Sequence, residues 1–307
     1  MKRQLDAHAK HGLAAGGTAR PARADWTIDQ GWSAYTAADH ATWRTLFERQ
    51  RALLPGRACD EFLQGMAELP IAPDRIPDFR ALSDVLRART GWEVVAVPGL
   101  VPDEVFFEHL AHRRFPAGNF IRRPEQLDYL EEPDVFHDVF GHVPMLANPV
   151  VADYLQAYGE GGLRARRLGT LAQLARVYWY TIEFGLVAQA DGLRLYGAGI
   201  ASSFAETTFA LDDPSPHRVG FDLARVMRTR YRIDDFQEVY FVIRSFDELL
   251  DLARVDFAPL YAQVRGAPEF DPGQLAPTDH VRHRGTGAHH HRAPGDPAAA
   301  AAEPSPP

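Results

Sequence analysis

The segment EPDVFHDVFGHVP, residues 132–144, contains two histidines, His137 and His142, that are five positions apart. On a continuous α-helix this spacing turns the two imidazoles about 140° away from each other. We therefore expect an interruption at Gly141 and Pro144, because glycine permits a turn and proline cannot extend a helix. His142 could then face the same point as His137. Two imidazoles placed in this way form half of a site for a first-row metal ion.

A third ligand would have to come from another element, and Glu183 is the strongest candidate. It lies in a predicted helix from Leu171 to Gln189 and is surrounded on its own face by Trp179, Tyr180, Leu186 and Val187. Burying an unpaired carboxylate among such side chains costs several kcal/mol, so the group needs a cation. Two histidines and one glutamate match the facial triad of non-haem Fe(II) oxygenases, which leaves positions open for other ligands.

Other interpretations of these residues stay open at this point. The glutamate could simply pair with Arg176, and the same three ligands could hold a hydrolytic zinc ion. The chain has no H-E-x-x-H motif, which argues against a zinc peptidase of that type. The run Gly197-Ala198-Gly199 begins like a dinucleotide fingerprint, but the third glycine is missing.

The composition limits the function classes. The 307 residues are 46% hydrophobic and 11% aromatic, which is enough for a sizeable core, and the net charge is −8. This acidic balance argues against nucleic acid or an anionic membrane as the main partner. Cys59 is the single cysteine, so no intrachain disulfide can form. With no signal peptide or membrane-spanning run in the sequence, we expect a cytoplasmic protein.

The pattern along the chain predicts one domain of the mainly α class. We expect a flexible leader over residues 1–24, a helical domain with minor short β-strands over 25–273, and a disordered Pro/Ala/His-rich tail over 274–307. Strands are predicted at Trp92–Val97 and Phe236–Ile243, the second with alternating faces. Helices are predicted around Phe62–Leu69 and Phe79–Leu86, and at Pro102–His112, Pro124–Leu130, Pro133–Gly141, Val150–Tyr158, Thr170–Gln189 and Phe246–Val255.

Four segments together resemble the tetrahydropterin-dependent aromatic amino acid hydroxylases, and the bacterial phenylalanine 4-hydroxylases among them most closely. They are EPDVFHDVFGHVP (132–144), RVYWYTIEFGL (176–186), LYGAGIASSFAE (195–206) and FQEVYFVIRSF (236–246). The resemblance covers roughly residues 25–270. It implies hydroxylation of L-phenylalanine to L-tyrosine with dioxygen and a tetrahydropterin cosubstrate, which donates two electrons, at a single Fe(II).

The resemblance also implies roles for individual residues. His137, His142 and Glu183 would ligate the iron, and Asp138 would accept a hydrogen bond from a ligand imidazole. The residues implied to bind the substrate are Arg122 (on its carboxylate), Tyr129, Trp179 and Ser202; those implied to hold the pterin are Gly99, Val101 and Phe106. Without the resemblance, Phe106 and Trp179 would be read as core side chains and Asp138 as a solvent-facing helix residue.

Substrate and assembly are expectations of the same kind. Apolar Ile233 stands where tyrosine hydroxylases of the family tend to carry an acidic residue, which favours the unhydroxylated ring of phenylalanine. A tryptophan hydroxylase is the alternative within the family, and a non-catalytic metal-binding or amino-acid-binding protein is the alternative outside it. The short leader and the tail composition predict an unregulated monomer without nucleic-acid or membrane partners.

Overall fold

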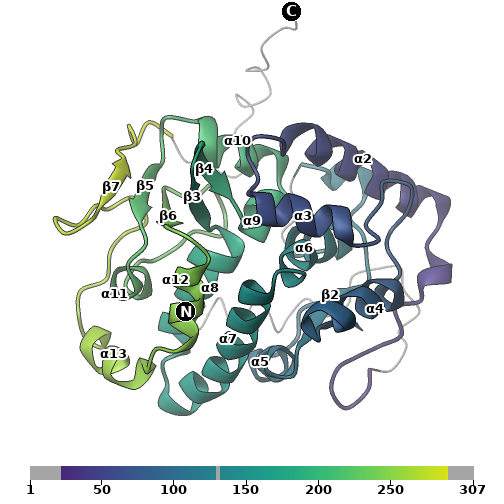
Figure 1. Ribbon diagram of the computed structural model, residues 1–307, viewed down its shortest axis with the longest axis horizontal. Helices are drawn as coiled ribbons and strands as arrows, with labels where there is room; N and C mark the ends of the chain where they lie inside the picture. The colour runs from purple at the N-terminus through teal and green to yellow at the C-terminus, as the bar shows by residue number, and fades with distance from the viewer. Residues whose placement is uncertain (1–21, 129–131, 290–307) are drawn as a thin grey trace, which may run out of the picture.

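The computed structural model describes residues 22–128 and 132–289, which form a mainly helical domain with short strands, as predicted (Figure 1). None of the described helices combines the length and the apolar character that crossing a membrane requires. The helices are η1 (Trp32–Ala34), α2 (Ala37–Leu53), α3 (Asp60–Glu68), α4 (Phe79–Thr90), α5 (Asp103–Ala111), η2 (Pro124–Gln126), η3 (Phe136–His142), α6 (Val143–Leu146), α7 (Pro149–Leu168), α8 (Leu171–Tyr178), η4 (Trp179–Glu183), α9 (Ala198–Ala201), α10 (Phe204–Asp212), α11 (Leu223–Met227), α12 (Asp247–Ala253) and α13 (Phe257–Val264).

The described strands form two sheets. The smaller sheet consists of β1 (Glu93–Val97) and β2 (Arg114–Gly118). The larger sheet consists of β3 (Leu186–Gln189), β4 (Gly192–Leu195), β5 (His217–Gly220), β6 (Val239–Ile243) and β7 (Val281–His283). The first pair is parallel, and the larger sheet is mixed with the order β4-β3-β6-β5-β7. All five residues of the central β6 are buried. The alternation predicted for 236–243 is therefore wrong, because both faces of a central strand are covered.

Helix α7 runs through the middle of the domain and packs against α5 and α12 (Figure 1). Its start is stabilised by the Asn148 side chain, which accepts hydrogen bonds from two backbone N–H groups, and it ends at Gly169 with φ 67°. A side chain at Gly162 would meet the Phe107 ring at 2.0 Å. Glycine at this position therefore lets α5 approach α7 closely.

The helix predicted over 170–189 is wrong in its second half. The segment is α-helical only to Tyr178 and continues as the π-helix η4 to Glu183. From Leu186 it forms strand β3. Strand β3 pairs with β4 on one side and β6 on the other. A Cβ at Gly185 would lie 2.2 Å from the Tyr196 ring. Sheet pairing and this close approach override the helical pattern that the local sequence suggested.

Two other predictions also change. The helix predicted over 124–130 is only the short η2 within the described part, and residues 129–131 lie outside it. The tail predicted from 274 is not disordered where the structure describes it, because Val281–His283 pairs with β5 as an antiparallel edge strand. The helices predicted at 102–112 and 150–158 and the strand predicted at 92–97 are confirmed, with α7 extending ten residues further, to Leu168.

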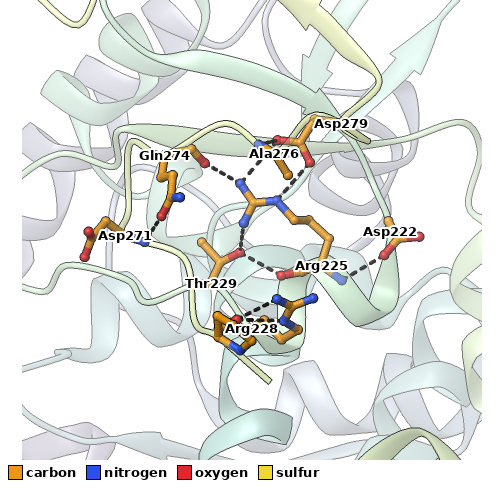
Figure 2. A network of polar contacts seen from close by, with 9 residues as sticks. Asp222, Arg225, Arg228, Thr229, Asp271, Gln274, Ala276 and Asp279 are labelled. Carbon is orange, nitrogen blue, oxygen red and sulfur yellow. Dashed lines mark hydrogen bonds and ion pairs between the residues drawn. The ribbon is translucent and has the colours of Figure 1, made fainter. Parts of the chain in front are cut away.

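The chain beyond α13 is held against α11 by a buried ion pair between Arg225 and Asp279 (Figure 2). The Arg225 Nε donates to Asp279 Oδ1 at 2.9 Å, and its other nitrogens donate to Thr229 and to the carbonyl of Gln274. The Phe270 ring lies 3.9 Å from the guanidinium carbon. Arg225 thus connects the short helix α11 to Phe270, Gln274 and Asp279, which all lie in the chain beyond α13.

We expect Asp279→Ala to destabilise the protein by about 3–5 kcal/mol, because it leaves a buried guanidinium without its counter-ion. Asp251→Ala is the control, since its contact with Arg254 is 3.9 Å long and both side chains are at least 70% exposed. We expect that change to cost no more than about 1 kcal/mol. Urea unfolding measures both, and equal losses would contradict the role assigned to Arg225.

Candidate active site

The two histidines of the 132–144 segment lie in the π-helix η3, and this overturns the expected interruption at Gly141. A π-helix bonds residue i to i+5, so residues five apart fall about one turn apart on the same side. The Nε2 atoms of His137 and His142 are 3.2 Å from each other. Gly141 has a different purpose, since a Cβ there would meet the Ala198 carbonyl oxygen at 2.8 Å. Pro144 is the second residue of α6 and does not end the helical segment.

Aromatic packing holds the opposite side of η3. The rings of Phe136 and Phe140 stack 4.7 Å apart, and they contact Trp43 and Phe47 of α2 edge to face at 5.3 and 5.4 Å. All four side chains are at most 6% exposed. Because the aromatic side is fixed in the core, the two imidazoles are directed toward η4.

Glu183, the last residue of η4, completes the group. Its Oε1 lies 3.2 Å from Nε2 of His142 and its Oε2 lies 3.6 Å from Nε2 of His137. The three ligand atoms all lie within 4.8 Å of one another. The alternative partner Arg176 is engaged elsewhere, donating to the Met227 carbonyl and to Glu269. The donor set and its spacing fit one divalent metal ion.

The charge states of His137 and Glu183 suit a cation. Burial would lower the pKa of His142, but the Glu183 carboxylate reverses that effect and raises it, so a metal ion would have to displace a proton from this imidazole. Burial lowers the pKa of His137 to about 4, so this imidazole is neutral near pH 7. Burial alone would raise the pKa of Glu183, but the histidines and the backbone N–H of Gly199 reverse that effect and lower it. The glutamate is therefore a carboxylate. A neutral imidazole beside a carboxylate is the protonation state in which both bind a metal.

Ser202 orients one of the imidazoles. Its hydroxyl donates to the Ala198 carbonyl at 2.8 Å, so its oxygen is left to accept the Nδ1–H of His137 at 2.9 Å. A proton on Nδ1 leaves the lone pair of Nε2 directed at the metal position. The structure thus brings Ser202, expected in the substrate pocket, into contact with a histidine of the triad.

Asp138 is buried next to the triad. Burial raises the pKa of this carboxyl group to about 7, although the nearby His142 opposes the shift. The hydrogen bond that its Oδ2 accepts comes from the backbone N–H of Gly118 in β2, at 2.7 Å. Its contact with His142 is electrostatic. The hydrogen bond found at Asp138 therefore comes from the Gly118 backbone and not from an imidazole, as the expected role would require.

Arg122 is bound to the histidine-bearing segment 132–144 through Asp134. The Asp134 carboxylate accepts from Nε and Nη2 of Arg122, both at 2.9 Å, and also from the backbone N–H groups of Arg122 and His137. Asp134 is fully buried. Nη1 also donates to the Leu127 carbonyl at 3.4 Å. A guanidinium has five N–H donors, so one N–H of Nη1 and one of Nη2 are left for another carboxylate.

The remaining expected residues are Phe106, Gly99, Val101, Trp179 and Tyr129. Phe106 lies edge-on to Tyr178 at 5.8 Å, and Tyr178 in turn lies 6.3 Å from the His142 ring. The loop with Gly99 and Val101 precedes α5, and a Cβ at Gly99 would meet a Glu132 oxygen at 2.6 Å. Trp179 opens η4, four residues before Glu183. Tyr129 lies outside the described residues.

A family model for biopterin-dependent aromatic amino acid hydroxylases matches residues 31–260. The chain belongs to this family. It is 61% identical over 271 residues to the phenylalanine-4-hydroxylase of Ralstonia nicotianae, covering 88% of this chain and 86% of that one. It is also 61% identical over 268 residues to that of Caulobacter vibrioides, covering 87% and 91%. The family predicted from the four sequence segments is confirmed.

Solved structures of the same family have the same fold. A Chromobacterium violaceum phenylalanine hydroxylase with iron and phenylalanine bound is 55% identical, with a TM-score of 0.81 over 90% of this chain and 98% of that chain. A cobalt-bound structure of the enzyme from that organism is 56% identical, with a TM-score of 0.84 over 88% and 100%. The enzyme from Chromobacterium violaceum thus holds iron or cobalt in this fold.

Sequence reasoning missed two buried carboxylates near the site, Asp134 and Glu206. Asp134 had a signal, because it stands inside the histidine segment and three residues before His137. Glu206 had a weaker one, as an acidic residue in the LYGAGIASSFAE segment. Its Oε1 accepts from the Tyr240 hydroxyl and, at 3.4 Å, from the backbone N–H of Gln237. Neither partner is close in sequence, so only the fold reveals the contact.

We expect Ser202→Ala to weaken Fe(II) or Co(II) binding by about 10- to 100-fold, because the imidazole of His137 loses the group that orients it. The neighbouring Ser203→Ala is the matched control. Ser203 accepts only the Glu206 backbone N–H at the start of α10, so its loss costs about 1 kcal/mol of stability and leaves metal affinity unchanged. Competition with a chelator measures the affinity. Equal affinity losses in the two variants would refute the assignment.

Glu206 predicts a pH dependence of stability. Burial raises the pKa of this carboxyl group from 4.5 to about 7, partly opposed by the Tyr240 hydroxyl. The folded state therefore retains the proton over a pH range in which the unfolded chain has lost it. The resulting stabilisation is complete below pH 4.5, decreases as the pH rises, and is gone above about 7.

The variant Glu206→Gln stays neutral, so we expect it to exceed the wild type in stability at pH 8 by roughly 1–3 kcal/mol and to lose most of that advantage by pH 5. Urea unfolding at both pH values provides the measurement. Asp251→Asn, at an exposed side chain, serves as the control with an unchanged profile. An advantage that is the same at both pH values would contradict the assigned pKa.

Proposed function

We propose that this chain is a phenylalanine 4-monooxygenase, which converts L-phenylalanine to L-tyrosine with dioxygen and a tetrahydropterin. The iron would be held by His137, His142 and Glu183. The observation that carries the proposal is the convergence of three ligand atoms from η3 and η4 within 4.8 Å, in the fold of the biopterin-dependent hydroxylases. Such a triad leaves metal positions open for reaction partners.

The relatives support phenylalanine as the substrate. Those from Ralstonia nicotianae and Caulobacter vibrioides are named phenylalanine-4-hydroxylase, and the structure from Chromobacterium violaceum has phenylalanine bound. Ile233 is consistent with this choice, since it contributes no charge that would favour a phenol. Arg122 fits the carboxylate of a free amino acid, because Asp134 holds it in place while part of its fork remains available.

In the proposed mechanism, the protein positions the reactants and excludes water. Arg122 would bind the substrate carboxylate and Trp179 would form a wall of the ring pocket, which together orient the aromatic ring toward the metal position. Ser202 keeps the proton of His137 on Nδ1. Phe106 would stack on the pterin, beside the loop containing Gly99 and Val101. When bound, Fe(II) and the reduced pterin supply the electrons for dioxygen activation.

The alternative functions have less support. A tryptophan hydroxylase would use the same triad, but the two relatives quoted above are both named phenylalanine-4-hydroxylase. A non-catalytic binding protein would have little use for an intact triad beside a preoriented arginine, since burying these groups is costly. A zinc hydrolase does not fit the family.

We also propose that the protein acts as a cytoplasmic monomer. The absence of a disulfide partner for Cys59 is consistent with a reducing compartment. An acidic net charge of −8 offers no basis for nucleic-acid or membrane binding. Light scattering tests the oligomeric state, and a tetrameric mass or a sigmoidal response to phenylalanine would contradict this part of the proposal.

The decisive experiment combines the metal-free protein with Fe(II), a tetrahydropterin, dioxygen and phenylalanine, and quantifies tyrosine. We expect tyrosine only when all four are present. Glu183→Gln is the control, because a neutral amide is a poor ligand for a divalent cation, and we expect it to form no tyrosine. If bound iron gave no tyrosine, the substrate or the catalytic role would be wrong. If iron did not bind, the triad itself would be wrong.

Arg122 provides a second test. Arg122→Lys keeps the positive charge but removes the planar fork that can hold a carboxylate and Asp134 at once. We expect kcat/KM for phenylalanine to fall about 30- to 100-fold, mostly through KM. Arg123→Lys, on the adjacent and exposed side chain, is the control and should change little. A full kcat/KM in Arg122→Lys would exclude a carboxylate contact at this position.

A further inference from the structure

The indole of Trp179 is held on three sides. The Tyr231 ring stacks on it at 4.2 Å with the planes 16° apart, and the Phe184 ring lies 4.7 Å away at 33°. Its Nε1–H donates to Oε1 of Gln237 at 2.9 Å. Stacking alone does little to oppose a shift of the indole within the plane of its ring, and the hydrogen bond to Gln237 opposes such a shift.

Gln237 is itself fixed. It is 2% exposed, and its Nε2 donates to the Arg232 carbonyl at 2.9 Å. Its backbone N–H points to the buried carboxylate of Glu206. Turning the amide over would set its NH₂ against the indole N–H and its oxygen against a carbonyl, so one orientation satisfies all partners. The Gln237 side chain is therefore a fixed hydrogen-bond acceptor for the indole N–H of Trp179.

The same side chain organises the loop between α11 and β6. Residues 231–237 contain no helix or strand. The buried Gln237 side chain donates to the Arg232 carbonyl of this loop, and an ion pair joins the Arg232 and Asp234 side chains at the surface. Ile233, in the same loop, is 52% exposed. Loop and indole are thus joined by the stacked Tyr231 ring and by one buried amide, and only the amide fixes the indole through a hydrogen bond. A displacement of this loop would therefore also displace the indole of Trp179.

We propose that Gln237 is a positioning residue for substrate binding, which acts by fixing the indole of Trp179 against the 231–237 loop. The inference rests on the proposed function, because it takes Trp179 as a wall of the phenylalanine pocket. Gln237 is buried behind the indole and acts only through it. Its loss loosens a wall that the substrate ring contacts, so phenylalanine binding weakens while the metal triad is unaffected.

The test variant is Gln237→Met, which has a similar length and no hydrogen-bonding groups. We expect the Kd of phenylalanine, measured without dioxygen on the Fe(II) protein, to rise about five- to tenfold, the scale of one buried hydrogen bond. KM should rise in parallel, with kcat changed less than about twofold. The near-UV circular dichroism of the stacked Trp179 and Tyr231 should weaken, and Fe(II) affinity should stay the same.

A double-mutant cycle separates this role from a general loss of packing. In a Trp179→Phe background the indole N–H is absent, so adding Gln237→Met should change the phenylalanine Kd by less than about twofold. Asp234→Asn is the matched control, since it loosens the exterior of the same loop and does not touch the indole. Its Kd should remain within about twofold of the wild type.

Other outcomes would overturn the proposal. These are an unchanged Kd and near-UV signal in Gln237→Met, or a five- to tenfold loss that persists in the Trp179→Phe background. If Gln237→Met does not fold, Trp179→Phe alone carries the test, and a wild-type Kd in that variant refutes the role. These binding measurements need no turnover. A wild-type protein that binds phenylalanine but forms no tyrosine would refute the proposed function and leave the positioning role standing.

Discussion

The buried carboxylate of Asp134 is the contact on which the site depends. It accepts hydrogen bonds from the guanidinium and the backbone N–H of Arg122, and from the backbone N–H of His137 at the start of η3. One anion therefore sets both the arginine proposed for the substrate and the first histidine of the triad. A charge so deeply buried is tolerated only because several donors surround it.

The rest of the site follows from how η3 is anchored. Its aromatic side is packed into the core through Phe136 and Phe140, which leaves only one side for polar groups. The π-helical geometry then places two histidines on that side, where an ordinary α-helix would separate them. A second π-helix, η4, brings Glu183 from the other direction. Irregular helices of this kind are costly, and their occurrence at both ligand-bearing segments suggests that the site requires them.

The order of chemical groups around the triad also has a physical logic. Ser202 meets His137 directly, whereas Asp138 is bound to the backbone of β2 and influences His142 through its charge. At the start of η4, Trp179 is held by stacked rings and by the buried amide of Gln237. The contacts that hold Trp179 are therefore different from those that orient the two histidines.

The sequence by itself determined the mainly helical class, the family and the residues of the triad, because these depend on local patterns and on short segments of high specificity. It also identified Arg122 and Trp179 as candidates. It failed where long-range contacts decide. The local pattern from Thr170 is helical, but pairing with β4 and β6 turns its last residues into a strand.

The tertiary structure alone decided the means by which the site is built. The spacing of His137 and His142 suggested a broken helix, and the fold replaced it with a continuous π-helix packed against α2. The contacts of Glu206 with Tyr240 and of Gln237 with Trp179 became visible only when segments distant in sequence came together. Residue types show which chemistry is available, while the packing of the whole chain fixes the distances and the burial that make it usable.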